Sequence, residues 1–265
     1  MKELVILTRR ELWEHRSLWL APLIAAGVLV VLSVVGATGL STHIQVGDAA
    51  FESMQVPKVQ KALLALTTQI FVVATIAMIA YLLDCLYAER KDRSILFWKS
   101  LPVSDARTVL VKYGLAMLVM PLGVYLLAAV TFVVIHGIFR LVAPAFAIEI
   151  GGGSFVMTLQ ALGSLFANLM VTLLWYAPLA AWLMLASVLA RRSPWLIVAL
   201  VPVGLFIAEG ALFQTRHVLG FLGDRLRPAI EPMVTLQRPA LWLGLVATAG
   251  MLYIVIRLRR YRDDT

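Results

Sequence analysis

Six stretches of about 20 apolar residues divide this 265-residue chain, and they limit what it can fold into. The hydrocarbon core of a bilayer is about 30 Å thick, so an α-helix needs about 20 apolar residues to cross it. A water-soluble domain could not bury so many such stretches, since 61% of the residues are apolar and only 14% are charged. The sequence therefore predicts an all-α integral membrane protein with six transmembrane helices in a single domain, residues 1–265. The predicted spans cover residues 18–35, 64–86, 109–135, 161–190, 195–213 and 239–256.

Basic residues gather at the ends of these stretches. If the N-terminus is cytoplasmic, sixteen of the 23 Lys and Arg residues fall in cytoplasmic segments and seven in external ones. This bias follows the positive-inside rule, so we expect a multi-pass protein with both termini in the cytoplasm. The net charge of +8 then indicates contact with anionic membrane lipid and not with nucleic acid.

The segment before the first span, residues 1–17, is amphipathic. Its apolar residues fall within an arc of about 100° on a helical wheel, and most of its charged residues lie outside that arc. The pattern predicts a helix that lies in the membrane interface. A solvated leader is the alternative. The residues of the arc are Met1, Leu4, Val5, Thr8 and Leu12.

The segment that joins the second and third spans, Asp84 to Lys112, contains six Lys or Arg residues. It predicts a short helix over residues 89–101, which Pro102 ends because the residue before a proline disfavours the helical conformation. Ser104 can then cap the third span. An aromatic tip at Phe97 and Trp98 would be costly to leave in water, so it indicates either a partner surface or an interfacial loop whose tryptophan rests in headgroups.

This segment resembles the first cytoplasmic loop of the permeases of bacterial type-2, ABCG-like, ATP-binding-cassette exporters. The family pattern is an acidic-basic pair, a hydroxyl residue, a hydrophobic run, a Leu-Pro stop and a later lysine. The matching residues are Glu89, Arg90, Ser94, Ile95, Leu96, Leu101, Pro102, Val103, Ser104 and Lys112, while Arg93 stands where the family has glycine. The stretch from Ser187 to Pro194 is similar to the family's turn after the fourth span.

The resemblance implies a transmembrane permease subunit in the bacterial inner membrane. Residues 89–101 would be the coupling helix that docks on a separate ATPase subunit, and short re-entrant helices would precede the last span. Two ATPase subunits would bind ATP and Mg²⁺, and a second permease copy or a homologous permease would complete the pathway through the first, second and fifth spans. The expected coupling residues are Glu89, Arg90, Arg93, Ser94, Phe97, Trp98, Lys99, Leu101 and Pro102.

Polar residues within the spans are the candidates for the pathway. Thr68 and Thr75 are seven residues apart and share a helix face, with Gln69 one step round. Glu209 lies near the outer end of the fifth span, either as part of the pathway or as a residue at headgroup level. Because Ser and Thr also stabilise helix packing, these positions have two interpretations.

Motifs for covalent chemistry are missing from the sequence. The dipeptide Gly-Lys does not occur, so there is no Walker A motif, and no HExxH motif exists. We therefore expect no catalytic residue, no metal site and no cofactor bound by this chain. A membrane-embedded enzyme and a non-transporting anchor or sensor remain the alternatives to an exporter subunit.

Overall fold

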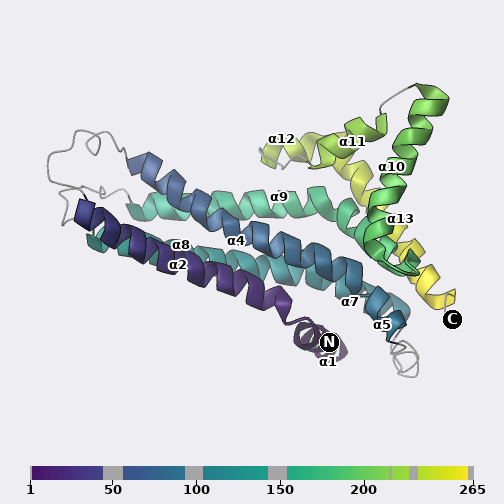
Figure 1. The fold of residues 1–265 in the computed structure, drawn as a ribbon, viewed down its shortest axis with the longest axis horizontal. Coiled ribbons are helices and arrows are strands. Elements are labelled where there is room, and N and C mark those ends of the chain that lie inside the picture. The colour runs from purple at the N-terminus through teal and green to yellow at the C-terminus, as the bar shows by residue number, and fades with distance from the viewer. Residues whose placement is uncertain are drawn as a thin grey trace. The chain divides into compact units, whose positions relative to one another are not determined.

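The computed structural model describes residues 2–43, 56–92, 104–142, 154–214, 217–226 and 232–261, and all of its regular structure in these ranges is helical (Figure 1). The helices are α1 (Lys2–Glu14), α2 (Ser17–His43), α4 (Val56–Asp84), α5 (Tyr87–Lys91), α7 (Asp105–Gly114), the π-helix η1 (Leu115–Val119), α8 (Met120–Val142), α9 (Ser154–Leu189), α10 (Pro194–Phe213), α11 (His217–Leu226), α12 (Pro232–Gln237) and α13 (Pro239–Tyr261).

Six helical stretches are long and apolar enough to cross a membrane, and each overlaps one of the spans predicted from the sequence. The prediction of an all-α membrane protein with six spans is thereby confirmed at the level of length and composition. The stretches are Ser17–Gly36, Thr67–Lys91, Asp105–Ile138, Leu159–Leu189, Pro194–Leu212 and Pro239–Tyr261.

The third stretch, Asp105–Ile138, begins at an N-cap and contains a short π-helix. The Ser104 hydroxyl accepts a hydrogen bond from the Arg107 amide at 3.4 Å, with Asp105 in the first turn, as the sequence predicts. The π-helix η1 directly precedes Met120 and Pro121. Pro121 has no N–H to donate, and its ring would clash with the preceding turn of a regular α-helix. The wider π-turn is the local adjustment that accompanies the proline.

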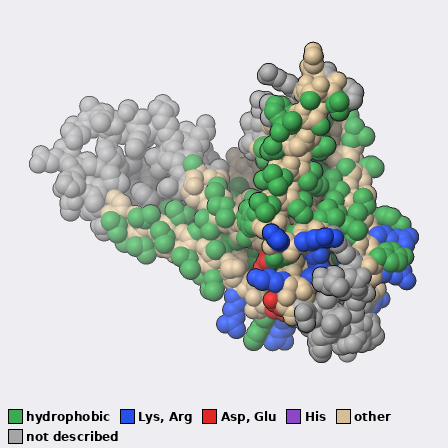
Figure 2. Space-filling model, turned by 45° about the vertical axis from the view of Figure 1, so that its right-hand side comes forward, with side chains coloured by type: hydrophobic (Ala, Val, Ile, Leu, Met, Phe, Trp, Pro, Cys, Tyr) green, Lys and Arg blue, Asp and Glu red, His purple; other side chains and the backbone are tan. Residues whose placement is uncertain are grey.

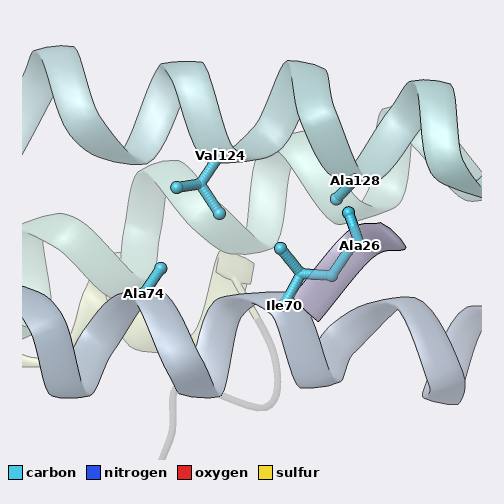
Figure 3. Packing of buried hydrophobic residues seen from close by; sticks show 5 residues of the cluster. All are labelled: Ala26, Ile70, Ala74, Val124 and Ala128. Atoms are coloured by element: carbon cyan, nitrogen blue, oxygen red, sulfur yellow. The ribbon is translucent and has the colours of Figure 1, made fainter. Parts of the chain in front are cut away.

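Contacts group the chain into two compact units. The α2–α8 unit consists of residues 16–77 and 120–166, and α2 lies alongside α8 in it (Figure 1). Small residues let these helices approach closely, as is common where helices pack within a membrane. The core of the unit consists of Ala26, Ile70, Ala74, Val124 and Ala128 (Figure 3).

The α13 unit consists of residues 1–15, 78–119 and 167–265. Within it α13 and α1 pack on α7, while α10 packs on α11. From Trp195 to Leu212 no residue of α10 is buried, so this helix presents an apolar surface along most of its length. On the face that Figure 2 shows, Lys and Arg side chains gather beside an apolar surface.

Short helices occur where the sequence predicts interfacial and re-entrant segments. The helix expected over residues 1–17 is α1, which ends at Glu14. Two short helices, α11 and α12, precede α13. Their depth in a membrane stays a prediction.

Candidate functional site

Helix α5 starts the charged loop after the second span, and its first turn is attached to the end of α9. The backbone amides of Leu86 and Tyr87 both donate to the Ser187 hydroxyl, at 3.2 and 3.0 Å. Amides in the first turn of a helix have no partner within their own helix, so an outside acceptor satisfies them. Ser187 is fully buried at this junction. A hydroxyl from α9 therefore fixes where the loop begins.

Arg90 makes the second attachment between α5 and α9. Its Nη2 donates to the carbonyl oxygens of Ser187 at 2.6 Å and of Ala190 at 3.1 Å. Carbonyls at the end of a helix lack partners in the helix, and a guanidinium there both bonds them and suits the helix dipole. The Tyr87 hydroxyl donates to the carbonyl of Arg192, in the turn after α9. The loop base and the turn after the fourth span thus form one bonded structure.

A buried ion cluster lies next to this junction, and Lys112 of α7 is its first cation. The Lys112 ammonium lies 2.8 Å from Oε1 of Glu11 in α1 and 3.1 Å from Oε1 of Glu89 in α5. The Tyr81 hydroxyl donates to Glu11 Oε2 at 3.1 Å. The side chains of Lys112, Glu11 and Glu89 are 2%, 4% and 9% exposed. One lysine therefore holds the N-terminal helix and the loop base together away from water.

Arg259 of α13 is the second cation of the cluster. Its Nη2 lies 3.0 Å from Oε2 of Glu89, and its Nε lies 3.1 Å from Oδ1 of Asp105. Glu89 thus bridges Lys112 and Arg259 with its two oxygens. We call Glu11, Glu89, Asp105, Lys112 and Arg259 the ion cluster. It brings the N-terminal helix, the loop base, the start of the third span and the end of the last span to one end of the α13 unit.

Because the ion cluster is buried, its charges stabilise the fold only while they stay paired. Moving a charge out of water costs several kcal/mol, and an opposite charge offsets this only when the geometry is close. Here each carboxylate lies within 3.1 Å of a cationic nitrogen, so the charges are compensated only while the helices stay in register. A displacement of any one helix would separate buried charges. The ion cluster therefore makes the relative positions of these helices interdependent.

The coupling residues expected from the sequence are only partly within the described ranges. Glu89 lies in the ion cluster and Arg90 on the end of α9, so the contacts that the structure gives both residues are intramolecular. The helix expected over residues 89–101 begins earlier, at Tyr87, and its described part ends at Lys91, before the turn at Asp92. The other expected residues lie outside the described ranges: Arg93, Ser94, Phe97, Trp98, Lys99, Leu101 and Pro102.

The pathway candidates lie in both units. In the α2–α8 unit the Thr68 and Thr75 hydroxyls donate to carbonyls of their own helix, at 2.6 and 2.7 Å, and Gln69 is exposed. Thr75 is exposed as well, so this face of α4 is open. In the α13 unit, Glu209 is half-buried on α10.

Arg225 is a buried cation. It is one of the seven Lys and Arg residues that the predicted topology places in external segments. It is 2% exposed, and its Nη1 donates to the Trp175 carbonyl at 3.0 Å. Its guanidinium lies 4.3 Å from the Trp175 ring, and Nη2 donates to the carbonyl of Ala240. Cation–π contact and carbonyl oxygens thus replace a carboxylate partner. Arg225 fastens α11 to α9 and α13.

Two residues of the ion cluster stand at positions of the sequence that indicate burial. Glu11 falls at the edge of the apolar arc of the N-terminal segment, where a charge has no place unless it is paired. Lys112 follows the fully buried Val109 by three residues and therefore shares its helix face. Their pairing, however, is a tertiary contact that helical periodicity does not reveal.

Comparisons with known proteins do not assign the chain to a family. No family model matches it, and neither the curated proteins nor the solved structures yield a match. Among the residues that the structure describes, no group of three or more His, Cys, Asp or Glu could hold a metal ion. The loop motif and the contacts of the loop base are the features that indicate a function.

Proposed function

We propose that this chain is the transmembrane subunit of a type-2, ABCG-like, ATP-binding-cassette exporter. It forms the substrate pathway and couples to a separate ATPase subunit, which binds ATP and Mg²⁺ and hydrolyses the nucleotide. The observation that carries the proposal is the attachment of the loop base. Glu89 and Arg90, the acidic-basic pair of the motif, connect the start of the loop to four other helices through the ion cluster and the α9 carbonyls.

Force transmission needs such an attachment. A loop that only touched the ATPase would bend when the ATPase moves, and the spans would stay where they are. A loop whose first turn is bonded to α9, and through Glu89 to Lys112 and Arg259, must move α7, α9 and α13 with it. ATP binding would then shift the population between inward-open and outward-open states. The subunit itself performs no covalent chemistry in this mechanism.

The assembly we propose contains two permease chains and two ATPase subunits. Its support is the exposure of α10, since no residue from Trp195 to Leu212 is buried within the chain. The open polar face of α4 around Thr75 is a second unpaired surface. In the proposed complex these fifth and second spans, with the first, form the permease interface and the pathway.

The proposed location is the bacterial inner membrane with both termini in the cytoplasm. The charge bias of the sequence supports this orientation. The ion cluster supports it as well, since it joins the N-terminal helix, the loop base and the end of α13. Those segments must therefore lie on the same side of the membrane.

The test is whether an ATPase that carries a Walker A motif co-purifies with this chain from the membranes of the native cells. The Trp98→Ala variant should lose the ATPase, or keep it without ATP-driven export into membrane vesicles, while it still inserts and folds. A buried aromatic anchor typically contributes about 2 kcal/mol or more to such a contact. The neighbouring Lys99→Ala variant is the control and should retain the ATPase, because rim charges contribute less. Full ATPase binding and transport in Trp98→Ala would refute the proposed docking.

A further inference from the structure

One face of α13 is exposed from Val246 to Tyr261. Val246, Gly250, Tyr253, Arg257 and Tyr261 follow one another at intervals of three or four residues, so they share a side of the helix. All five are exposed. The opposite side is buried and carries Arg259 toward the ion cluster, which leaves this face without a partner in the described part of the chain.

Arg257 is held in place on this face by two tyrosines. Its Nε donates to the Tyr253 hydroxyl at 2.9 Å, and its Nη1 donates to the Tyr261 hydroxyl at 3.4 Å. The guanidinium lies 5.2 Å from the centre of the Tyr253 ring. No carboxylate of the described residues pairs with Arg257. The described residues therefore orient the charge without pairing it with a carboxylate, and the entropy cost of fixing the side chain is met before any ligand arrives.

An apolar strip continues from this arginine along the helix. A side-chain carbon at Gly250 would meet nothing within 4 Å, and Val246 is 72% exposed. Because Gly250 has no side chain, the helix backbone is uncovered between Val246 and Tyr253. From Val246 to Arg257 the helix rises about 16 Å at 1.5 Å per residue. That length matches one leaflet of a hydrocarbon core about 30 Å thick.

We propose that this face of α13 binds an anionic phospholipid. The phosphate sits on the Arg257 guanidinium between the two tyrosine hydroxyls, and an acyl chain follows the strip past Gly250 to Val246. A guanidinium suits phosphate because its planar N–H groups bond two oxygens at once. Tyrosines are common at the headgroup level of membrane proteins because their rings are amphipathic. A second copy of this helix would fit less well, because a symmetric contact would bring the positive charges of two Arg257 side chains together. The proposal does not depend on the exporter function.

The experiment measures lipid binding by native mass spectrometry of the purified chain, titrated with phosphatidylglycerol or phosphatidylcholine. We expect a preference for phosphatidylglycerol that Arg257→Gln weakens about fivefold, the effect of one well-placed basic residue. The control is Arg10→Gln, which removes one charge from α1 and should leave the preference unchanged. Equal losses in the two variants would overturn the site, since the attraction would then be a general charge effect.

Two charge-neutral variants test the geometry and guard against a folding defect in Arg257→Gln. The Tyr253→Phe, Tyr261→Phe double variant keeps the arginine and removes both hydroxyls, so it should weaken phosphatidylglycerol binding at least twofold. Gly250→Leu covers the bare backbone at this position with a bulky side chain and should weaken binding of the same lipid. Unchanged binding in both would overturn the proposal. So would efficient disulfide dimers of Gly250→Cys in a Cys85→Ser background, because a second copy would then occupy the face.

Discussion

The ammonium of Lys112 lies 2.8 Å from a carboxylate oxygen of Glu11, although the two residues are 101 positions apart in the chain. Both side chains are almost fully buried, at 2% and 4% exposure. The pair joins the N-terminal helix to the third span, and Glu89 extends it to the loop base at 3.1 Å. Neither charge can lose its partner without a large loss of stability.

Removing the cation of this pair should destabilise the protein strongly. Lys112→Met leaves Glu11 without its cation and takes one of two cations from Glu89, and breaking a buried pair typically costs about 3–5 kcal/mol. We expect a clear fall in the thermal unfolding midpoint in detergent. Arg10→Gln is the control, since the Arg10–Glu14 pair is exposed and contributes about 0–1 kcal/mol. Similar midpoints for the two variants would contradict the buried ion cluster.

The hydroxyl of Ser187 should matter more than that of an ordinary serine within a helix. In Ser187→Ala the amides of Leu86 and Tyr87 lose their acceptor, at a cost of about 1–3 kcal/mol. Hydrogen exchange at these two amides should become faster. The matched control is Ser33→Ala, because Ser33 is also buried but bonds only to the Val30 carbonyl of its own helix. If exchange at residues 86 and 87 is the same in both variants, α9 does not hold the loop base.

His15 gives the protein a pH dependence whose sign can be worked out. It lies outside the spans, with its ring 4.9 Å from that of Tyr81, and burial lowers its pKa from the ordinary 6.5. Lys112 acts in the same direction. The acidic neighbours Glu11, Glu14 and Asp84 oppose the shift. The unfolded chain therefore binds the proton more tightly than the folded chain. The contribution of the neutral His15 to the stability of the fold is present above pH 6.5 and is lost as the pH falls toward the folded-state pKa.

The measurement is the unfolding midpoint at pH 7.5 and at pH 5.5. The unaltered protein should unfold at a lower temperature at pH 5.5, and His15→Phe should show a smaller difference because it has no proton to bind. An equal pH effect in both proteins would assign the dependence to other groups. A higher midpoint at pH 5.5 would contradict the sign of the shift.

Cross-linking tests the proposed permease interface, and the chain offers a clean background because Cys85 is its only cysteine. In Cys85→Ser, a cysteine at Ile207 of α10 should form disulfide-linked dimers under oxidation. The matched control is a cysteine at Val130 of α8, which is as exposed as Ile207, at 62%. Dimers through Val130 and none through Ile207 would exclude α10 from the interface.

The spans are predictable from the sequence because the bilayer sets both the length and the polarity that a crossing helix needs. The cap at Ser104 is predictable because capping depends on neighbouring residues alone. The partners of Glu11 and Arg259 are not predictable. A single sequence reveals the periodicity of each helix, but it does not show which distant helix a charged face contacts. The burial of Arg225 is not predictable for the same reason, because its carbonyl and aromatic partners lie on α9 and α13.

The most direct test of the proposed function is photo-cross-linking from position 98 in intact cells. Trp98 is replaced by a benzoyl-phenylalanine residue, and the products formed under ultraviolet light are identified by mass spectrometry. The account predicts an adduct with a protein that carries a Walker A motif, and the same probe at Trp13 on α1 should not give that adduct. Adducts at position 98 with lipid alone, or only with another copy of this chain, would contradict the proposal that this loop couples the membrane helices to an ATPase.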